Sequence, residues 1–195
     1  MGPQYNTMIP YTHKLLNFVE PVLLNQILDN IITPKWETLS DPSALKEYTD
    51  SLPVKVTDYV FLSQLQSKYP NLADTIKFLK SSKGSWPIHC DTHRQTAINI
   101  PLRNTNNTFT VFHEGGTSVD SVYAQFGNVL QEWFSNKYIT YFNDSVEVYR
   151  EVLDCPTVVN TSKPHGIINN GDKTRWICSW AYNGTFEQAL EDFGV

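Results

Sequence analysis

The sequence predicts a mainly β domain that is braced by helices near its N-terminus, on three observations. An apolar pattern with helical spacing runs through residues 12–33. From Trp86 onward, short runs rich in Ile, Val, Thr, Phe and Tyr alternate with Asn, Gly, Asp and Pro clusters, which is typical of strands and turns. The chain has 195 residues, enough for one domain to bury a core without disulfides or zinc. Many short strands favour an antiparallel sandwich or barrel that hides its edges.

Two helical patterns lie in the first part of the chain. In residues 12–33 apolar residues recur at spacings of three and four, with Thr12 as an N-cap and a second helix beginning at Pro21. Residues 60–80 form the other candidate, which Pro70 divides into two shorter helices.

The strand candidates lie in the second half of the chain. Residues 123–134 look more like a short helix or an irregular insertion, because Val129, Leu130 and Trp133 fall on one side. The expected strands are Thr96–Leu102, Thr108–His113, Ser145–Leu153, Thr157–Asn160, Gly166–Asn169 and Thr174–Tyr182.

Composition excludes several classes of protein. A formal net charge of −5 argues against nucleic-acid binding, which needs a basic face. No apolar run approaches the ~18 residues of a membrane span, and no secretory signal is visible. Cys90, Cys155 and Cys178 are odd in number and widely spaced, so they form neither a disulfide framework nor a CxxC metal pair. We therefore expect a reduced, cytoplasmic protein with no nucleic-acid or membrane partner.

A His-x-Asp pair, His89 and Asp91, is the first candidate for chemistry. Alternate residues of a strand point to one face, so both side chains can reach the same point in space. With a histidine from a distant strand they would form a two-histidine, one-carboxylate set that leaves metal positions open, as in non-haem Fe(II) oxygenases. The simpler reading of His89 is a half-buried histidine that is hydrogen-bonded to a carboxylate.

A segment further along supplies the remaining candidates. His165 and Arg175 flank the turn signal Asn169-Asn170-Gly171-Asp172, and a hairpin there would place Arg175 beside the strand that carries His165. An arginine within an apolar, aromatic run usually binds a carboxylate. Ser179 falls on the same strand face as Arg175, where its hydroxyl could share that carboxylate.

These residues together resemble a known family. His89-x-Asp91, a distant His165, and Arg175 ten positions later are similar to the motif of the Fe(II)- and 2-oxoglutarate-dependent oxygenases. The stretches HCDTHRQTAINIPL and NTSKPHGIINNGDKTRWICSW also resemble small prolyl- and aspartyl/asparaginyl-hydroxylase-like members, of the kind seen in marine microbial and phage genomes. The matching motifs lie between residues 86 and 182, about half of the chain.

The resemblance implies a fold, a cofactor set and site roles. The fold would be a double-stranded β-helix, or jelly roll, of the cupin-like kind. His89, Asp91 and His165 would be the catalytic iron ligands, and Arg175 would bind the distal carboxylate of 2-oxoglutarate. Ser179 matches a position where several members place a hydroxyl on that carboxylate. The Arg-x-Ser form of some branches is absent, because Ile177 stands there, and this removes those branches.

Four further residues keep alternative roles open. His93 continues the His89/Asp91 face and could be a third ligand or lie near the substrate. His113, followed by Glu-Gly-Gly, could give a cupin-like ligand or simply end a strand. Arg94 could hold substrate or form a surface salt bridge. Asn99, inside an apolar strand, needs partners for its amide and could bind either the cofactor or only the backbone.

We expect one domain over residues 1–195, with a helical part (1–80), a jelly-roll catalytic core (81–185) and a tail or short helix (186–195). The predicted function is oxidation or hydroxylation of an unknown small-molecule or peptide substrate with O2, Fe(II) and 2-oxoglutarate, releasing succinate and CO2. Two alternatives are a silent jelly-roll binding module and a cupin-type metalloenzyme that does not use 2-oxoglutarate. The sequence leaves the substrate and the oligomeric state open.

Overall fold

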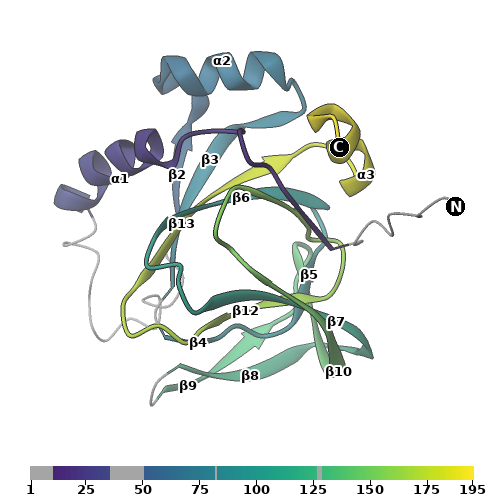
Figure 1. Cartoon of the computed structure of the whole chain (residues 1–195). Helices are drawn as coiled ribbons and strands as arrows, with labels where there is room; N and C mark the ends of the chain where they lie inside the picture. Colours follow the sequence, from purple (N-terminus) through teal and green to yellow (C-terminus); the bar gives the residue numbers. More distant parts are fainter. Residues whose placement is uncertain (1–10, 36–50, 82, 127–128) are drawn as a thin grey trace, which may run out of the picture.

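Two antiparallel sheets lie face to face in the computed structural model, which describes residues 11–35, 51–81, 83–126 and 129–195 (Figure 1). The large sheet has six strands in the order β1 (Thr12–Lys14), β11 (Thr157–Asn160), β6 (Thr96–Arg103), β13 (Arg175–Tyr182), β3 (Leu72–Ser81) and β2 (Ser51–Lys55). The small sheet has the order β4 (Gly84–Ser85), β12 (His165–Asn169), β5 (His89–Asp91), β10 (Ile139–Val152) and β7 (Thr108–Val119). An additional pairing of β12 with β7 ties this sheet together.

Over the described ranges, the remaining elements are three α-helices, a 3-10 turn and a hairpin. Their bounds are α1 Pro21–Lys35, the turn Val56–Asp58, α2 Val60–Lys68, β8 Ser121–Phe126, β9 Val129–Phe134 and α3 Phe186–Phe193. In Figure 1, α1 and α2 lie at the top, on the far side of β2 and β3 from the small sheet. Within the described ranges, no helix is both long and apolar enough to cross a membrane.

The connections between the sheets are those of a jelly roll. Going along the chain, β3, β6, β11 and β13 join the large sheet, while β5, β7, β10 and β12 join the small one. Apart from the β7–β10 hairpin, each step carries the chain from one sheet to the other. The predicted fold class, a mainly β double-stranded β-helix braced by helices, is therefore confirmed.

The outer face of the large sheet is apolar and is covered by the helices. Trp180 on β13 stands opposite Ile76 on β3 and Ile98 on β6, and all three side chains are fully buried. They belong to one hydrophobic cluster with Leu28 of α1 and Leu62 of α2. The main core therefore lies between the sheet and the helices, not between the two sheets.

The inner face of the same sheet carries several polar side chains. Side chains alternate along a strand, so the residues between the core positions turn toward the small sheet. Ser179 on β13 stands opposite Lys77 on β3 and Asn99 on β6, and Arg175 stands opposite Ser81. Polar groups on this face make it the lining of a cavity.

Helix α3 has well-defined signals at both ends. Thr185 accepts a hydrogen bond from the backbone N–H of Gln188, and the Gln188 side chain accepts one from the Thr185 N–H, which is a complete capping box. Gly194 ends the helix with a φ of 75°, in the left-handed region that glycine adopts without a steric penalty.

Two of the helical predictions near the N-terminus are corrected by strand pairing. Residues Thr12–Lys14 form β1, which pairs with β11, so Thr12 is not an N-cap; the helix does begin at Pro21, as expected. The second predicted helix ends at Lys68, and Leu72–Ser81 is a strand. Strand β3 is held on both sides by β13 and β2, and these long-range ladders outweigh a local pattern that fitted either structure.

The predicted helix or irregular insertion at residues 123–134 is also wrong. Strands β8 and β9 pair antiparallel, with Val122 opposite Trp133 and Phe126 opposite Val129. Apolar residues on one side of a helix favoured a helical structure. In the hairpin, however, the backbone N–H and C=O groups of the two stretches pair with each other.

The turn at Asn169 is present, but it does not form the expected hairpin. The Asn169 side chain accepts a hydrogen bond from the Gly171 N–H at 3.0 Å, which tightens the turn. The strands on either side then join different sheets, since β12 pairs with β4, β5 and β7, whereas β13 pairs with β3 and β6. Arg175 therefore faces His165 from the opposite sheet and does not lie beside it.

The position of the core leads to a stability prediction. Leu28 is fully buried in α1, whereas Val22 on the same helix is 55% exposed. Leu28→Ala is expected to lower the free energy of unfolding by about 2–5 kcal/mol, because it opens a cavity between helix and sheet. Val22→Ala should change it by less than about 0.5 kcal/mol. Urea denaturation measures both, and equal effects would contradict this packing.

Candidate metal centre

Three side chains from two strands of the small sheet converge on one point. His89 and Asp91 lie at the two ends of β5, and His165 begins β12 directly opposite His89. One nitrogen from each imidazole and one Asp91 oxygen all lie within 4.8 Å of one another. Among the described residues, no other group of three or more His, Cys, Asp or Glu side chains could hold a metal ion.

Backbone carbonyls fix the orientation of both imidazoles. Nδ1 of His89 lies 2.9 Å from the Pro87 carbonyl oxygen, and Nδ1 of His165 lies 2.9 Å from the Lys163 carbonyl oxygen. A carbonyl oxygen only accepts, so each Nδ1 carries the proton and donates. The Nε2 lone pair of each ring is then left for a ligand, an arrangement that metal-binding histidines commonly have.

Burial keeps these imidazoles neutral. It lowers the pKa of His165 to about 3, with the neighbouring His89 adding to the effect. Burial also lowers the pKa of His89, against the opposing pull of the Asp91 carboxylate. Neutral imidazole is the form that binds a metal ion.

Arg94 neutralises the carboxylate. Its Nε and Nη2 donate to Oδ2 of Asp91 at 3.0 and 2.7 Å. Burial alone would raise the pKa of Asp91, but the charge of Arg94, together with its hydrogen bonds to the carboxylate, holds it below its ordinary value. Oδ1 of Asp91, 3.9 Å from Nε2 of His89, is the oxygen that faces the histidines.

Gly166 allows β12 to approach the segment between β4 and β5, residues 86–88. A Cβ at this position would lie 2.9 Å from the Trp86 carbonyl oxygen and 2.7 Å from the Cδ1 atom of Ile88. The Trp86 N–H donates to the Ile167 carbonyl at 2.7 Å across this contact. Glycine is therefore required beside His165 for the two histidines to meet.

A cavity of about 190 Å³, the inner cavity, opens between the two sheets at these three residues. Both sheets contribute to its walls. Its lining consists of Leu79, Lys80, Ser81, Trp86, His89, Asp91, Arg94, Asn99, Thr110, Ile139, Thr161, His165, Ile167, Arg175, Ile177 and Ser179.

Arg175 brings a buried cation into this cavity. Its side chain is 2% exposed, and its Nε and Nη2 atoms have no hydrogen-bond partner among the described residues. Burial lowers the pKa of the guanidinium to about 10, which still leaves it charged at neutral pH. Ser81 Oγ and Asn99 Oδ1, in the same lining, are also buried, and neither has a hydrogen-bond partner in the part of the chain that the structure describes. Unsatisfied buried groups are rare in folded proteins, and here they gather around one cavity.

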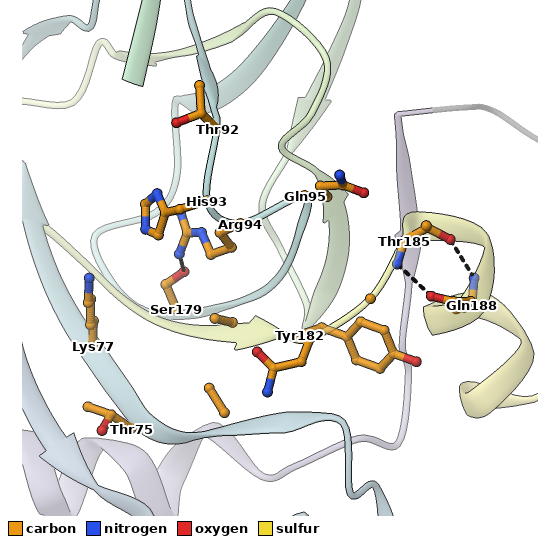
Figure 2. Close-up of a pocket in the computed structure, with 14 residues that line it drawn as sticks. Thr75, Lys77, Thr92, His93, Arg94, Gln95, Ser179, Tyr182, Thr185 and Gln188 are labelled. Carbon is orange, nitrogen blue, oxygen red and sulfur yellow. Dashed lines mark hydrogen bonds between the residues drawn. The ribbon is translucent and has the colours of Figure 1, made fainter. Parts of the chain in front are cut away.

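Other residues singled out from the sequence lie elsewhere or have other partners. Ser179 lines the inner cavity, but its Oγ accepts a hydrogen bond from Nη1 of Arg94 at 3.2 Å (Figure 2). His113 bonds to Ser145 through Nδ1, outside the cavity lining. His93 lies near the carbonyl of Tyr138, apart from the three converging residues.

Sequence reasoning missed one residue of this site, Ser81, and did not give Arg94 a buried partner. Ser81 stands opposite Arg175 across β3 and β13, a neighbour that only the sheet register reveals. Arg94 was considered as a surface ion pair, yet its partner is the buried Asp91. The spacing Asp91-x-x-Arg94 was a usable signal, since residues three apart can meet where the chain turns after a strand.

Chemically, the arrangement offers two neutral imidazole nitrogens and one carboxylate oxygen from one side, and a buried guanidinium from the other. Such a nitrogen- and oxygen-rich set, with its protein ligands on one side, suits a divalent first-row metal with open positions. The unpaired guanidinium suits a carboxylate. A small oxoacid that bridges the two sheets would satisfy both.

Comparison with solved structures finds similar folds at low sequence identity. A prolyl-4-hydroxylase from Pseudomonas putida matches with a TM-score of 0.48 and 12% identity, covering 90% of this chain and 94% of that chain. HygX from Streptomyces hygroscopicus, with nickel and 2-oxoglutarate bound, gives 0.45 and 9%, covering 91% and 84%. A viral collagen prolyl hydroxylase from Paramecium bursaria Chlorella virus-1, in a 2OG complex, gives 0.43 and 12%, covering 88% and 94%.

No family model and no curated protein sequence matches this chain. All three identities are 12% or less, and all three TM-scores are below 0.5.

The ion pair at the centre leads to a test on the metal-free protein. The Asp91 side chain is 6% exposed and that of Arg94 is 21% exposed. Arg94→Met leaves the carboxylate buried without a counter-charge, so the free energy of unfolding should fall by about 3 kcal/mol, the low end for a broken buried pair.

Adding Asp91→Asn to Arg94→Met should recover part of that loss, because it removes the uncompensated charge. Chemical denaturation of Arg94→Met, of Asp91→Asn and of the double variant measures this. If the second substitution instead lowers stability further by its full single-variant cost, the two side chains are not coupled.

Proposed function

We propose that this protein is an Fe(II)- and 2-oxoglutarate-dependent dioxygenase. The observation that carries the proposal is Arg175, a buried guanidinium with two unpaired nitrogens that faces His89, Asp91 and His165 across one cavity. A buried cation without a counter-ion is costly. A carboxylate bound there would remove that cost, and the three converging residues offer a place for the metal that the other end of the same ligand would reach.

For the distal carboxylate of 2-oxoglutarate we assign Arg175 together with Ser81, in place of Ser179. Ser81 is the cross-strand neighbour of Arg175, and its hydroxyl lacks a partner. Ser179 lies four residues along β13, about 13 Å away at ~3.3 Å per residue, and its hydroxyl already accepts from Arg94. Ser81 is therefore the nearer and less engaged hydroxyl for a carboxylate on Arg175.

Asn99 is assigned to the metal-facing end of the ligand. It stands opposite Ser179 on the neighbouring strand, and Ser179 is joined through Arg94 to Asp91. Its buried amide oxygen lacks a partner. Asn99 therefore borders the end of the cavity at which the metal would lie, while Arg175 and Ser81 border the other end.

The residues present fit the metal ion. Nε2 of His89, Nε2 of His165 and Oδ1 of Asp91 would hold Fe(II), since the remaining atoms of these groups are already hydrogen-bonded to Pro87, Lys163 and Arg94. When bound, Fe(II) and 2-oxoglutarate supply O2 activation and oxidation of a substrate C–H bond, with release of succinate and CO2. The chain itself contributes placement: Arg94 restricts Asp91 to a single free oxygen, and Arg175 sets the direction of the dicarboxylate.

The size of the inner cavity agrees with this assignment. At about 190 Å³ it is smaller than the ~300–1,000 Å³ of pockets for drug-sized ligands, so it suits a five-carbon diacid. Apolar side chains such as Ile167 and Ile177 share the lining and limit the water around the acid.

Neither rival function is favoured by a specific observation. A silent binding module gives no reason for Arg175 to remain buried and unpaired. A cupin-type enzyme that draws on His93 or His113 would need one of them near the other ligands, and both lie outside that group.

Anaerobic addition of Fe(II) and 2-oxoglutarate tests the proposed function. A weak visible charge-transfer band is expected, because 2-oxoglutarate would bind the metal directly through its keto oxygen and the adjacent carboxylate. His89→Ala and His165→Ala should each abolish it by removing a ligand. His113→Ala, which removes a histidine outside the site, is the control and should keep the band. Absence of the band in the unaltered protein, with no iron-dependent 2-oxoglutarate turnover, would refute the proposal.

Arg175→Met gives a second test, which needs no turnover. The ligand-free variant should be more stable to urea by about 1–3 kcal/mol, because an unpaired buried charge has been replaced by an apolar side chain. At the same time it should lose the thermal stabilisation that 2-oxoglutarate gives to the Mn(II)-loaded protein. A variant that is less stable and still stabilised by 2-oxoglutarate would contradict the assigned role.

Ser81→Ala and Ser179→Ala are a matched pair of hydroxyl deletions on neighbouring strands. Ser81→Ala should weaken 2-oxoglutarate binding about fivefold, the effect of one lost hydrogen bond. Ser179→Ala should change the dissociation constant by less than about twofold. If Ser179→Ala instead weakens binding more than Ser81→Ala does, the carboxylate is held by Ser179 and not by Ser81.

A further inference from the structure

A second, larger cavity adjoins the inner one. This outer cavity has a volume of about 540 Å³ and lies between β3, the end of β13 and the segment from Thr92 to Gln95 that follows β5 (Figure 2). Arg94 and Ser179 line both cavities. The hydrogen bond between them therefore forms part of the wall between the candidate metal centre and the outer cavity.

The charges around the two cavities are opposite in sign to those of the whole chain. The protein has 20 acidic and 15 basic residues. Three basic residues line the two cavities from the inner side, Lys77, Arg94 and Arg175, against one acidic residue, Asp91. No carboxylate lines the outer cavity among the described residues.

Lys77 lines the outer cavity, and none of the described residues provides it with a counter-ion. It stands opposite Ser179 on the inner face of the large sheet, and it forms no ion pair or hydrogen bond with the described residues. In Figure 2 its nitrogen end points toward the side of the cavity on which His93 and Arg94 lie. Arg94, in contrast, is already paired with Asp91.

We propose that the outer cavity binds a small substrate through an anionic group, a carboxylate or a phosphate, which pairs with Lys77. The proposal rests on the proposed function, in which the charges of Fe(II) and 2-oxoglutarate cancel. The excess of basic residues then remains to attract a negative group, and clefts with one sign of charge concentrate ligands of the opposite sign. The hydroxyl of Thr75 and the amide of Gln95 add polar contacts in the same lining.

The volume fits this class of ligand. About 540 Å³ lies within the ~300–1,000 Å³ of small-molecule sites. With its charged group on Lys77, such a substrate would extend past Arg94 and Ser179 toward the three converging residues. Arg94 would then contact the substrate on one side while it holds Asp91 on the other.

Amide NMR titration of the metal-free protein with inorganic phosphate, and separately with acetate, tests the site by itself. Shifts are expected in the amides of residues 92–95, and the tighter of the two anions identifies the preferred group. Lys77→Met should raise the dissociation constant at least about fivefold, the value of one ion contact at ~4 Å in water. Lys55→Met is the matched control: it removes an exposed lysine on the neighbouring strand β2, outside the outer cavity, and should change nothing. Equal affinity in all three proteins would overturn the proposal.

A second arm separates this inference from the proposed function. In protein loaded with Mn(II) and saturated with 2-oxoglutarate, which occupies Arg175, bound phosphate should show faster 31P relaxation, and Lys77→Met should weaken this effect. If Mn(II) does not bind, the proposed function fails, yet Lys77-dependent shifts in the metal-free protein would still support an anion site. If Mn(II) and 2-oxoglutarate bind but neither anion depends on Lys77, the proposed function stands and this inference is wrong.

Discussion

The division of the large sheet into an apolar outer face and a polar inner face is the constraint on which the rest of the structure depends. Strand alternation sends Trp180, Ile76 and Ile98 outward, where α1 and α2 cover them. The same alternation sends Arg175 and Ser179 inward. Since the hydrophobic core lies under the helices, the space between the sheets does not have to be filled with apolar side chains. The helices therefore provide the stability that allows a polar cavity to exist.

Three cations line the two cavities, Arg175 and Lys77 from the inner face of the large sheet and Arg94 from the segment after β5. Arg175 is buried and unpaired, Arg94 is paired with Asp91, and Lys77 faces the outer cavity. Arg175 favours a bound dicarboxylate but lowers the stability of the ligand-free protein. Arg94 holds the Asp91 carboxylate beside the histidines. Lys77 favours an anionic substrate. Stability and function are in conflict at Arg175, as they often are at sites that await a ligand.

Local patterns in the sequence predicted the strands well and the long-range contacts poorly. Thr157–Asn160 matches β11 residue for residue, because β-branched residues lie between clear turn signals. Residues 72–80 fall within the predicted helical range, because Leu72, Ile76 and Leu79 recur at spacings of four and three, and only the ladders to β13 and β2 make this segment a strand. The turn after β12 was visible, but a turn does not specify which sheet the next strand joins. Ser81 could not be found from sequence, since it meets Arg175 through cross-strand register alone.

The most direct measurement of the central claim is anomalous scattering from crystals grown without oxygen in the presence of Mn(II) and 2-oxoglutarate. The expected result is a manganese peak bonded to Nε2 of His89, Nε2 of His165 and Oδ1 of Asp91, with the distal carboxylate of the acid on Nε and Nη2 of Arg175. A metal ion bound elsewhere, or a 2-oxoglutarate carboxylate that does not contact Arg175, would contradict it.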